Sequence, residues 1–129
     1  MIAEQTIHFR VRYSEADAMG YLHHSRYFQY FEVGRVELLR LAGISYADME
    51  RQGIFFVVAK AECNFKAPAG SDDELALTTR IARQTYVRID HEYELKRGDT
   101  LLATARTTIA CVDRDGKLQR IPPELGEPD

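Results

Sequence analysis

The sequence of 129 residues is poor in cysteine and has no excess of basic side chains. Its formal net charge is −3, whereas a nucleic-acid-binding domain usually carries a basic patch, so the composition argues against a nucleic-acid partner. The two cysteines, Cys63 and Cys111, stand in apolar, strand-like runs without a CxxC motif or a Cys/His cluster. We expect both to be buried, reduced thiols.

The sequence also lacks a segment that would cross a membrane or act as a signal peptide. No run approaches the ~18 apolar residues of a membrane span, and Met1 to Arg12 lack the apolar block of a signal peptide. The expected location is therefore the cytoplasm. Neither a P-loop nor a GxGxxG motif occurs, so we expect no nucleotide cofactor, and no ligand cluster predicts a metal. Residues 1–129 contain no repeat or linker and are expected to form one domain.

The clearest helical pattern runs from Ser25 to Ala42. One apolar face repeats at steps of four and three, through Tyr27, Phe31, Gly34, Leu38 and Leu41. Further apolar residues widen this face, so the helix is expected to be buried on most sides. Gly34 costs about 1 kcal/mol relative to alanine in a helix interior, and we expect a close approach to a sheet as its compensation. A short second helix is predicted after Ser45, which resembles the start of a capping box.

Five other segments are predicted to be strands. Four alternate apolar and polar residues at the period of a β-strand, and the last, 101–112, alternates less clearly, so both its faces are expected to be partly covered. The five segments are 7–13, 57–65, 74–81, 87–96 and 101–112, and turn-like segments rich in glycine, proline and aspartate separate the later ones. Long strands joined by short turns are expected to be antiparallel. The predicted fold is therefore α+β, a curved five-stranded antiparallel sheet wrapped around one long helix. Because one helix provides little core, we also expect pairing with a second copy.

The residues best placed for chemistry lie between the first strand and the long helix. This loop contains Glu15, Asp17, His23 and His24, next to a helix N-terminus whose free N–H groups can hold a developing oxyanion. A carboxylate on the same loop can attack a carbonyl carbon or activate water to do so. The combination suits acyl transfer, although most carboxylates in such loops only cap a helix or are solvated.

The stretch from Tyr13 to Arg35, YSEADAMGYLHHSRYFQYFEVGR, resembles the motif of the 4-hydroxybenzoyl-CoA thioesterase-like family of hotdog-fold acyl-CoA thioesterases. The matching residues are Tyr13, Glu15, Asp17, Gly20, His24, Tyr27, Tyr30, Phe31, Glu32 and Arg35. Agreement in strand order and length extends over residues 5–113. The resemblance implies the hotdog fold and hydrolysis of an acyl-CoA or aroyl-CoA to the free acid and CoA. This chain departs from many relatives in having Glu15 in place of a first aspartate and Met19 in place of a small residue.

The resemblance also implies roles for single residues. Asp17 falls on the catalytic carboxylate, as nucleophile or as general base. The backbone N–H of His24 would polarise the thioester oxygen, and its side chain would assist catalysis or only orient the substrate. Gly20 would let the backbone approach the ligand, and Tyr27 would line the acyl pocket. Sites in this family lie at a dimer interface, so a homodimer, or a tetramer of two such dimers, is implied.

Other polar residues receive more modest interpretations. The CoA phosphates need cations, and the candidates near strand ends are Lys66, Arg83 and Arg88. Glu32 and Arg35 are expected to form an i,i+3 ion pair. His91 shares the apolar face of its strand and is expected to be a core histidine with its hydrogen bonds satisfied. Glu15 is expected to be structural or solvated, and His23 to be a packing residue.

Two other functions remain open from the sequence. The first is hydrolysis of acyl groups held by a carrier protein, but several relatives of that kind lack the catalytic carboxylate, so Asp17 favours CoA. The second is a non-catalytic acyl-CoA-binding module.

Overall fold

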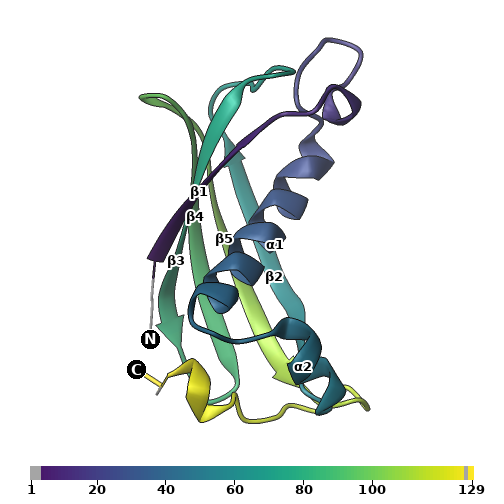
Figure 1. The fold of residues 1–129 in the computed structure, drawn as a ribbon, viewed down its shortest axis with the longest axis vertical. Coiled ribbons are helices and arrows are strands. Elements are labelled where there is room, and N and C mark those ends of the chain that lie inside the picture. Colours follow the sequence, from purple (N-terminus) through teal and green to yellow (C-terminus); the bar gives the residue numbers. More distant parts are fainter. Residues whose placement is uncertain (1–3, 127) are drawn as a thin grey trace.

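The computed structural model describes residues 4–126 and 128–129 and consists of one sheet and one long helix. Along the chain come β1 (Glu4–Arg10), α1 (His24–Leu41), α2 (Tyr46–Arg51), β2 (Phe55–Phe65), β3 (Glu74–Gln84), β4 (Arg88–Arg97) and β5 (Thr100–Val112). The strands pair antiparallel in the order β1-β3-β4-β5-β2, and α1 packs on one face, mainly against β1 and β3 (Figure 1). The predicted α+β architecture is confirmed.

The first strand ends earlier than the alternation predicted. β1 stops at Arg10, and the next residue, Val11, exchanges backbone hydrogen bonds of 2.9 and 2.8 Å with the segment before β3. The chain then turns through a 3₁₀ helix, Tyr13–Glu15, which leaves the Tyr13 side chain 89% exposed. Tyr13 was expected on the buried face of the strand, so this boundary was wrong.

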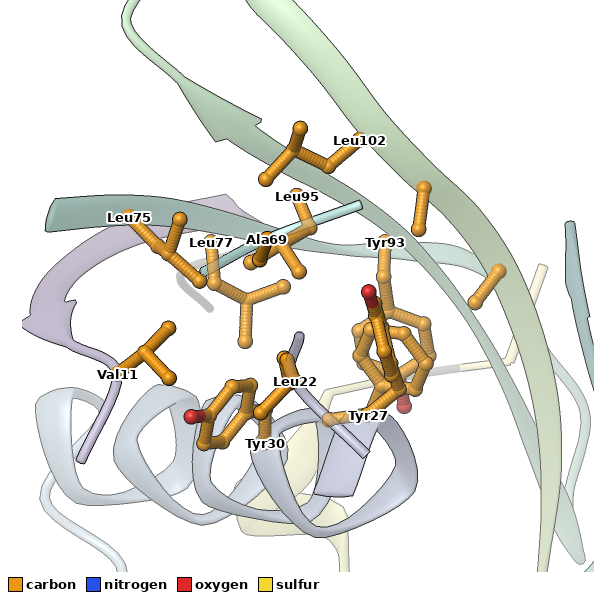
Figure 2. Close-up of a cluster of buried hydrophobic side chains, with 13 residues drawn as sticks. Val11, Leu22, Tyr27, Tyr30, Ala69, Leu75, Leu77, Tyr93, Leu95 and Leu102 are labelled. Carbon is orange, nitrogen blue, oxygen red and sulfur yellow. The ribbon is translucent and has the colours of Figure 1, made fainter. Parts of the chain in front are cut away.

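The core lies between α1 and the sheet. Tyr27, Tyr30 and Phe31 point from the helix toward leucines of β3 and β4 (Figure 2 labels most of this cluster). Gly34 lets the helix backbone approach β3, because a methyl group there would collide with Thr79 Oγ1 and come within 3.0 Å of Leu77. The close approach expected to compensate for this glycine is therefore confirmed.

The edge strand β2 is poorly covered within one chain. Apolar side chains on it remain about half exposed, at 45% for Val57, 54% for Val58 and 53% for Phe65. A bulge between Val58 and Lys60 shifts the pairing with β5 by one residue, so the alternation predicted for residues 57–65 breaks inside the strand. An exposed apolar sheet edge of this kind favours pairing with another chain.

Both cysteines are free, as expected. Cys111 is buried as predicted, whereas Cys63 is only half-buried. Burial raises the pKa of the Cys63 thiol to about 11, so this thiol is protonated at neutral pH. Within the described residues, no helix is long and apolar enough to span a membrane.

Candidate active site

The loop before α1 folds into a short antiparallel arm. The Asp17 N–H donates to the carbonyl of Tyr21 at 2.7 Å, and the His23 N–H donates to the carbonyl of Glu15 at 2.9 Å. Gly20 forms the turn at the tip with a φ of +80°, a left-handed conformation that favours glycine. The loop therefore turns tightly at Gly20.

This arm is fixed to the segment between β2 and β3. The Leu22 N–H donates to the carbonyl of Ala69 at 2.8 Å, and the Ser71 N–H donates to the carbonyl of Gly20 at 3.3 Å. Leu22 and Ala69 are buried, at 5% and 0% exposure, and belong to the core cluster of Figure 2. Because both its backbone and its apolar side chain are anchored, the loop has a defined position relative to the sheet.

The carboxylate of Asp17 has two unequal oxygens. Oδ1 accepts hydrogen bonds from the backbone N–H groups of Met19, at 2.8 Å, and of Tyr21, at 3.1 Å. Among the described residues, Oδ2 has no hydrogen-bond donor or cation paired with it, and the residue is exposed. One oxygen therefore stabilises the loop, while the other is free to act on a substrate. Loop capping and catalysis, which the sequence presented as alternatives, are compatible in this geometry.

The start of α1 offers one free backbone donor. His23 is the N-cap, and its Nδ1 accepts a hydrogen bond from the Ser25 N–H at 3.2 Å. The Arg26 N–H donates to the carbonyl of His23 at 2.9 Å. Within the part of the chain that the structure describes, the His24 N–H at this first turn has no such partner. A helix N-terminus with an unsatisfied N–H attracts negative charge, as an oxyanion site requires.

His23 and Glu15 have structural roles, as predicted, although the role of His23 is more specific than packing. Histidine is not among the preferred N-cap residues, so no sequence signal indicated that it would cap the helix. Its ring lies 4.2 Å from that of His24, centroid to centroid. Glu15 Oε1 accepts hydrogen bonds from the Tyr30 hydroxyl and the Arg12 N–H, both at 2.8 Å, and thus ties the loop to α1.

The residues expected to contact substrate do not all lie near this loop. Tyr27 is buried in the core, where its ring meets the Phe65 ring edge-on at a centroid distance of 4.8 Å. Lys66 directly follows β2, at the end of the strand where Phe65 meets Tyr27. Strand pairing through β5 and β4 places Phe65 level with Leu77 of β3. Arg83 lies six residues further along β3, a distance of about 20 Å. Arg83 and Arg88 therefore lie at the end of the sheet opposite Lys66. Within a single chain, these cations cannot bind one phosphate together with Lys66.

The expected Glu32–Arg35 ion pair does not form in the described structure. Arg35 instead donates from Nη1 to the hydroxyl of Tyr93 at 3.1 Å, and that hydroxyl also lies 2.6 Å from Thr107 Oγ1. The i,i+3 spacing could not reveal this, because the competing partner comes from a strand 58 residues later.

His91 lies beside this network and differs from its prediction in one respect. It is buried, as expected, but its Nδ1 has no hydrogen-bond partner among the described residues. Burial, with a smaller contribution from Arg35, lowers the pKa of His91 to about 3. This histidine is therefore neutral at physiological pH and is not the satisfied core residue that the pattern predicted.

Comparison with known proteins identifies the family. A model described as Thioesterase-like superfamily matches residues 11–128. The chain belongs to this superfamily. Within it, the acyl-CoA thioesterase YbgC of Haemophilus influenzae is 33% identical over 113 residues, covering 87% of this chain and 82% of that protein.

Solved structures of the superfamily agree with the fold. A hypothetical protein from Aquifex aeolicus superposes with a TM-score of 0.89 at 33% identity, over 94% of this chain and 95% of that one. A DHNA-CoA thioesterase from Staphylococcus aureus superposes with a TM-score of 0.87 at 30% identity, over 91% of this chain and 80% of that one. The resemblance to hotdog-fold thioesterases, stated from residues 13–35, is confirmed.

Proposed function

We propose that this chain is a thioesterase that hydrolyses an acyl-CoA or aroyl-CoA, with Asp17 as the catalytic carboxylate. The observation that carries the proposal is the pairing of a free carboxylate oxygen, Asp17 Oδ2, with an open backbone donor, the His24 N–H, on one anchored loop. The superfamily and the name of the Haemophilus influenzae relative support the thioester bond as the target.

The chemistry needs only these two groups. The His24 N–H, at the positive end of the α1 dipole, donates to the thioester oxygen and stabilises the negative charge that develops there. Asp17 either attacks the carbonyl carbon, forming an anhydride that water then cleaves, or takes a proton from the water that attacks. In both routes the carbon–sulfur bond breaks, CoA leaves as a thiolate that takes up a proton, and the acyl group is released as the carboxylic acid. Oδ1 stays bound to the loop and keeps the carboxylate oriented.

We also propose that the active unit is a homodimer, alone or as half of a tetramer, formed through β2. The exposed apolar residues of this edge strand support such pairing. A two-fold axis would bring the Phe65 end of one β2 beside the Phe56 end of the other. Because Phe65 contacts Tyr27 in the first turns of α1, the loop of one chain would then face the α2 end of the other. Light scattering on the purified chain should show particles of two or four chains, and a stable monomer would contradict the proposal.

The activity is tested by release of free thiol from a panel of acyl-CoAs, from acetyl through palmitoyl to benzoyl. We expect turnover of at least one member. The same acyl groups on a carrier protein should be hydrolysed more slowly. If a folded oligomer bound acyl-CoA without turning over any member, the non-catalytic binding module would replace the enzyme as the best explanation.

A further inference from the structure

α2 lies beside the end of α1 that is far from the Asp17 loop (Figure 1). Residues of α1, α2 and β2 line a concave site there. It is an open cleft of about 760 Å³, within the range of small-molecule sites. Its walls are mixed. Val36, Ile44 and Val58 form an apolar part, and Glu32, Arg40, Ser45 and Glu50 form a charged and polar part. Arg35, Tyr46 and Phe56 complete the lining. The dimer proposed above turns this cleft toward the Asp17 loop of the other chain.

A second, smaller cavity of about 30 Å³ lies next to the cleft, under α1. The two share Arg35, Tyr46 and Phe56, so these three side chains stand between them, and the Tyr46 hydroxyl donates to the Phe56 carbonyl at 3.3 Å. Apart from Arg35 and His91, the lining of the inner cavity is apolar or aromatic. Its volume has room for little more than one water molecule, so an occupant of the cleft can extend inward only by a small group.

The inner cavity is closed by the segment that follows β5. Leu125, in a short 3₁₀ helix (Pro123–Leu125), is 1% exposed and lines the cavity. This segment is held in place by the end of β3. The side-chain amide of Gln84 donates to the carbonyl of Gly126 at 3.1 Å, and backbone and side chain of Asp129 bond to the backbone of Gln84, both at 2.8 Å. Gln84 is itself buried, at 3% exposure.

We propose that Leu125 is the residue that limits the length of the acyl group. In this arrangement, which rests on the proposed function, the thioester lies at the Asp17 loop of one chain and the apolar acyl group lies along Val36, Ile44 and Val58 in the cleft of the other. The far end of the acyl group displaces the side chains of Arg35, Tyr46 and Phe56, enters the inner cavity and stops against Leu125. Hence the C-terminal segment, which contributes nothing to the reacting atoms, determines which acyl groups fit.

The experiment compares Leu125→Ala with wild type on saturated straight-chain acyl-CoAs of two to sixteen carbons. We expect kcat/KM to rise for substrates two to four carbons longer than the wild-type optimum, by about fourfold for each additional buried methylene. Leu125→Met, of similar volume, should keep the wild-type profile. The matched control is Ile121→Ala, since Ile121 is buried in the same cluster, at 4% exposure, but does not line the cavity.

A second variant tests the length limit independently, in case Leu125→Ala does not fold. Ala42→Val, at the C-cap of α1, narrows the same cavity and removes no contact of the C-terminal segment, so it should abolish turnover of the longest wild-type substrate first. Circular dichroism on each variant reports folding. An unchanged length profile in both folded variants would overturn the role of Leu125.

The proposal can be tested apart from catalysis. S-alkyl-CoA thioethers cannot be hydrolysed, so calorimetric titration with the same chain lengths measures the limit through binding alone. A shift of the limit in Leu125→Ala without turnover in wild type would support the length-limiting role and contradict the thioesterase. Turnover in wild type with the same limit in every variant would contradict only the role of Leu125.

Discussion

Replacing Asp17 with asparagine should lower kcat by at least about 1000-fold while the fold, the oligomer and the loop remain intact. Asparagine keeps a side-chain oxygen that can accept from the N–H groups of Met19 and Tyr21, the two bonds that Oδ1 makes. It removes the negative charge and the second carboxylate oxygen, which the proposed mechanism requires. Thiol release from the best acyl-CoA, with wild type in parallel, measures the effect.

The chain contains a matched control for this variant. Asp113 Oδ1 accepts from the N–H groups two and four residues later, Asp115 at 2.8 Å and Lys117 at 3.0 Å, in the same pattern as Asp17. Asp113→Asn should therefore have an equal effect on its own loop but leave kcat unchanged. If Asp17→Asn kept most of the wild-type activity, Asp17 would be only a loop cap. A comparable loss of kcat in Asp113→Asn would mean that such losses reflect structure rather than chemistry.

Acidification should destabilise the protein through His91. The pKa of this buried residue is lowered to about 3, whereas an unfolded chain binds the proton near pH 6.5. Below pH 6.5 the unfolded state is therefore protonated while the native state is not, so the free energy of unfolding falls as the pH falls, until about pH 3. One proton corresponds to about 1.4 kcal/mol per pH unit, or about 3 kcal/mol between pH 6.5 and pH 4.

Urea unfolding of wild type and His91→Leu at pH 7, 6, 5 and 4 measures this contribution. The difference between the two proteins isolates His91, because the other titrating groups are common to both. We expect the free energy of unfolding of the variant to fall less steeply with decreasing pH. Ile89→Val, on the same strand, should lower the free energy of unfolding by about 1 kcal/mol equally at every pH. Parallel pH profiles for wild type and His91→Leu would show that His91 does not resist protonation.

The sequence predicted those features that depend on neighbours along the chain. The period of 3.6 residues placed α1 within one residue at each end, and the glycine in its interior correctly indicated close packing on a strand. The loop motif directed attention to Asp17 and Gly20, whose positions are determined by hydrogen bonds spanning only two to four residues.

Features that depend on distant parts of the chain were not predictable. Arg35 bonds to Tyr93 rather than to Glu32, because the sheet brings that hydroxyl to the helix. Nothing in the residues near Leu125 indicates that it closes a cavity, since the other walls come from α1 and from the strands. The exposure of β2 could not be predicted either. The alternation of apolar and polar residues is the same in an inner strand and in an edge strand whose outer side is unpaired.

The proposed chemistry and the proposed length limit reside in different stretches of the polypeptide. The reacting groups lie within residues 13–24, on one end of α1, while the cavity is closed by the segment that follows β5, at the opposite end of the fold (Figure 1). Substitutions this far apart have nearly independent effects on stability. A lineage carrying this scaffold could thus exchange one substrate for another through a few changes near its C-terminus, while the machinery that cleaves the bond is inherited unaltered.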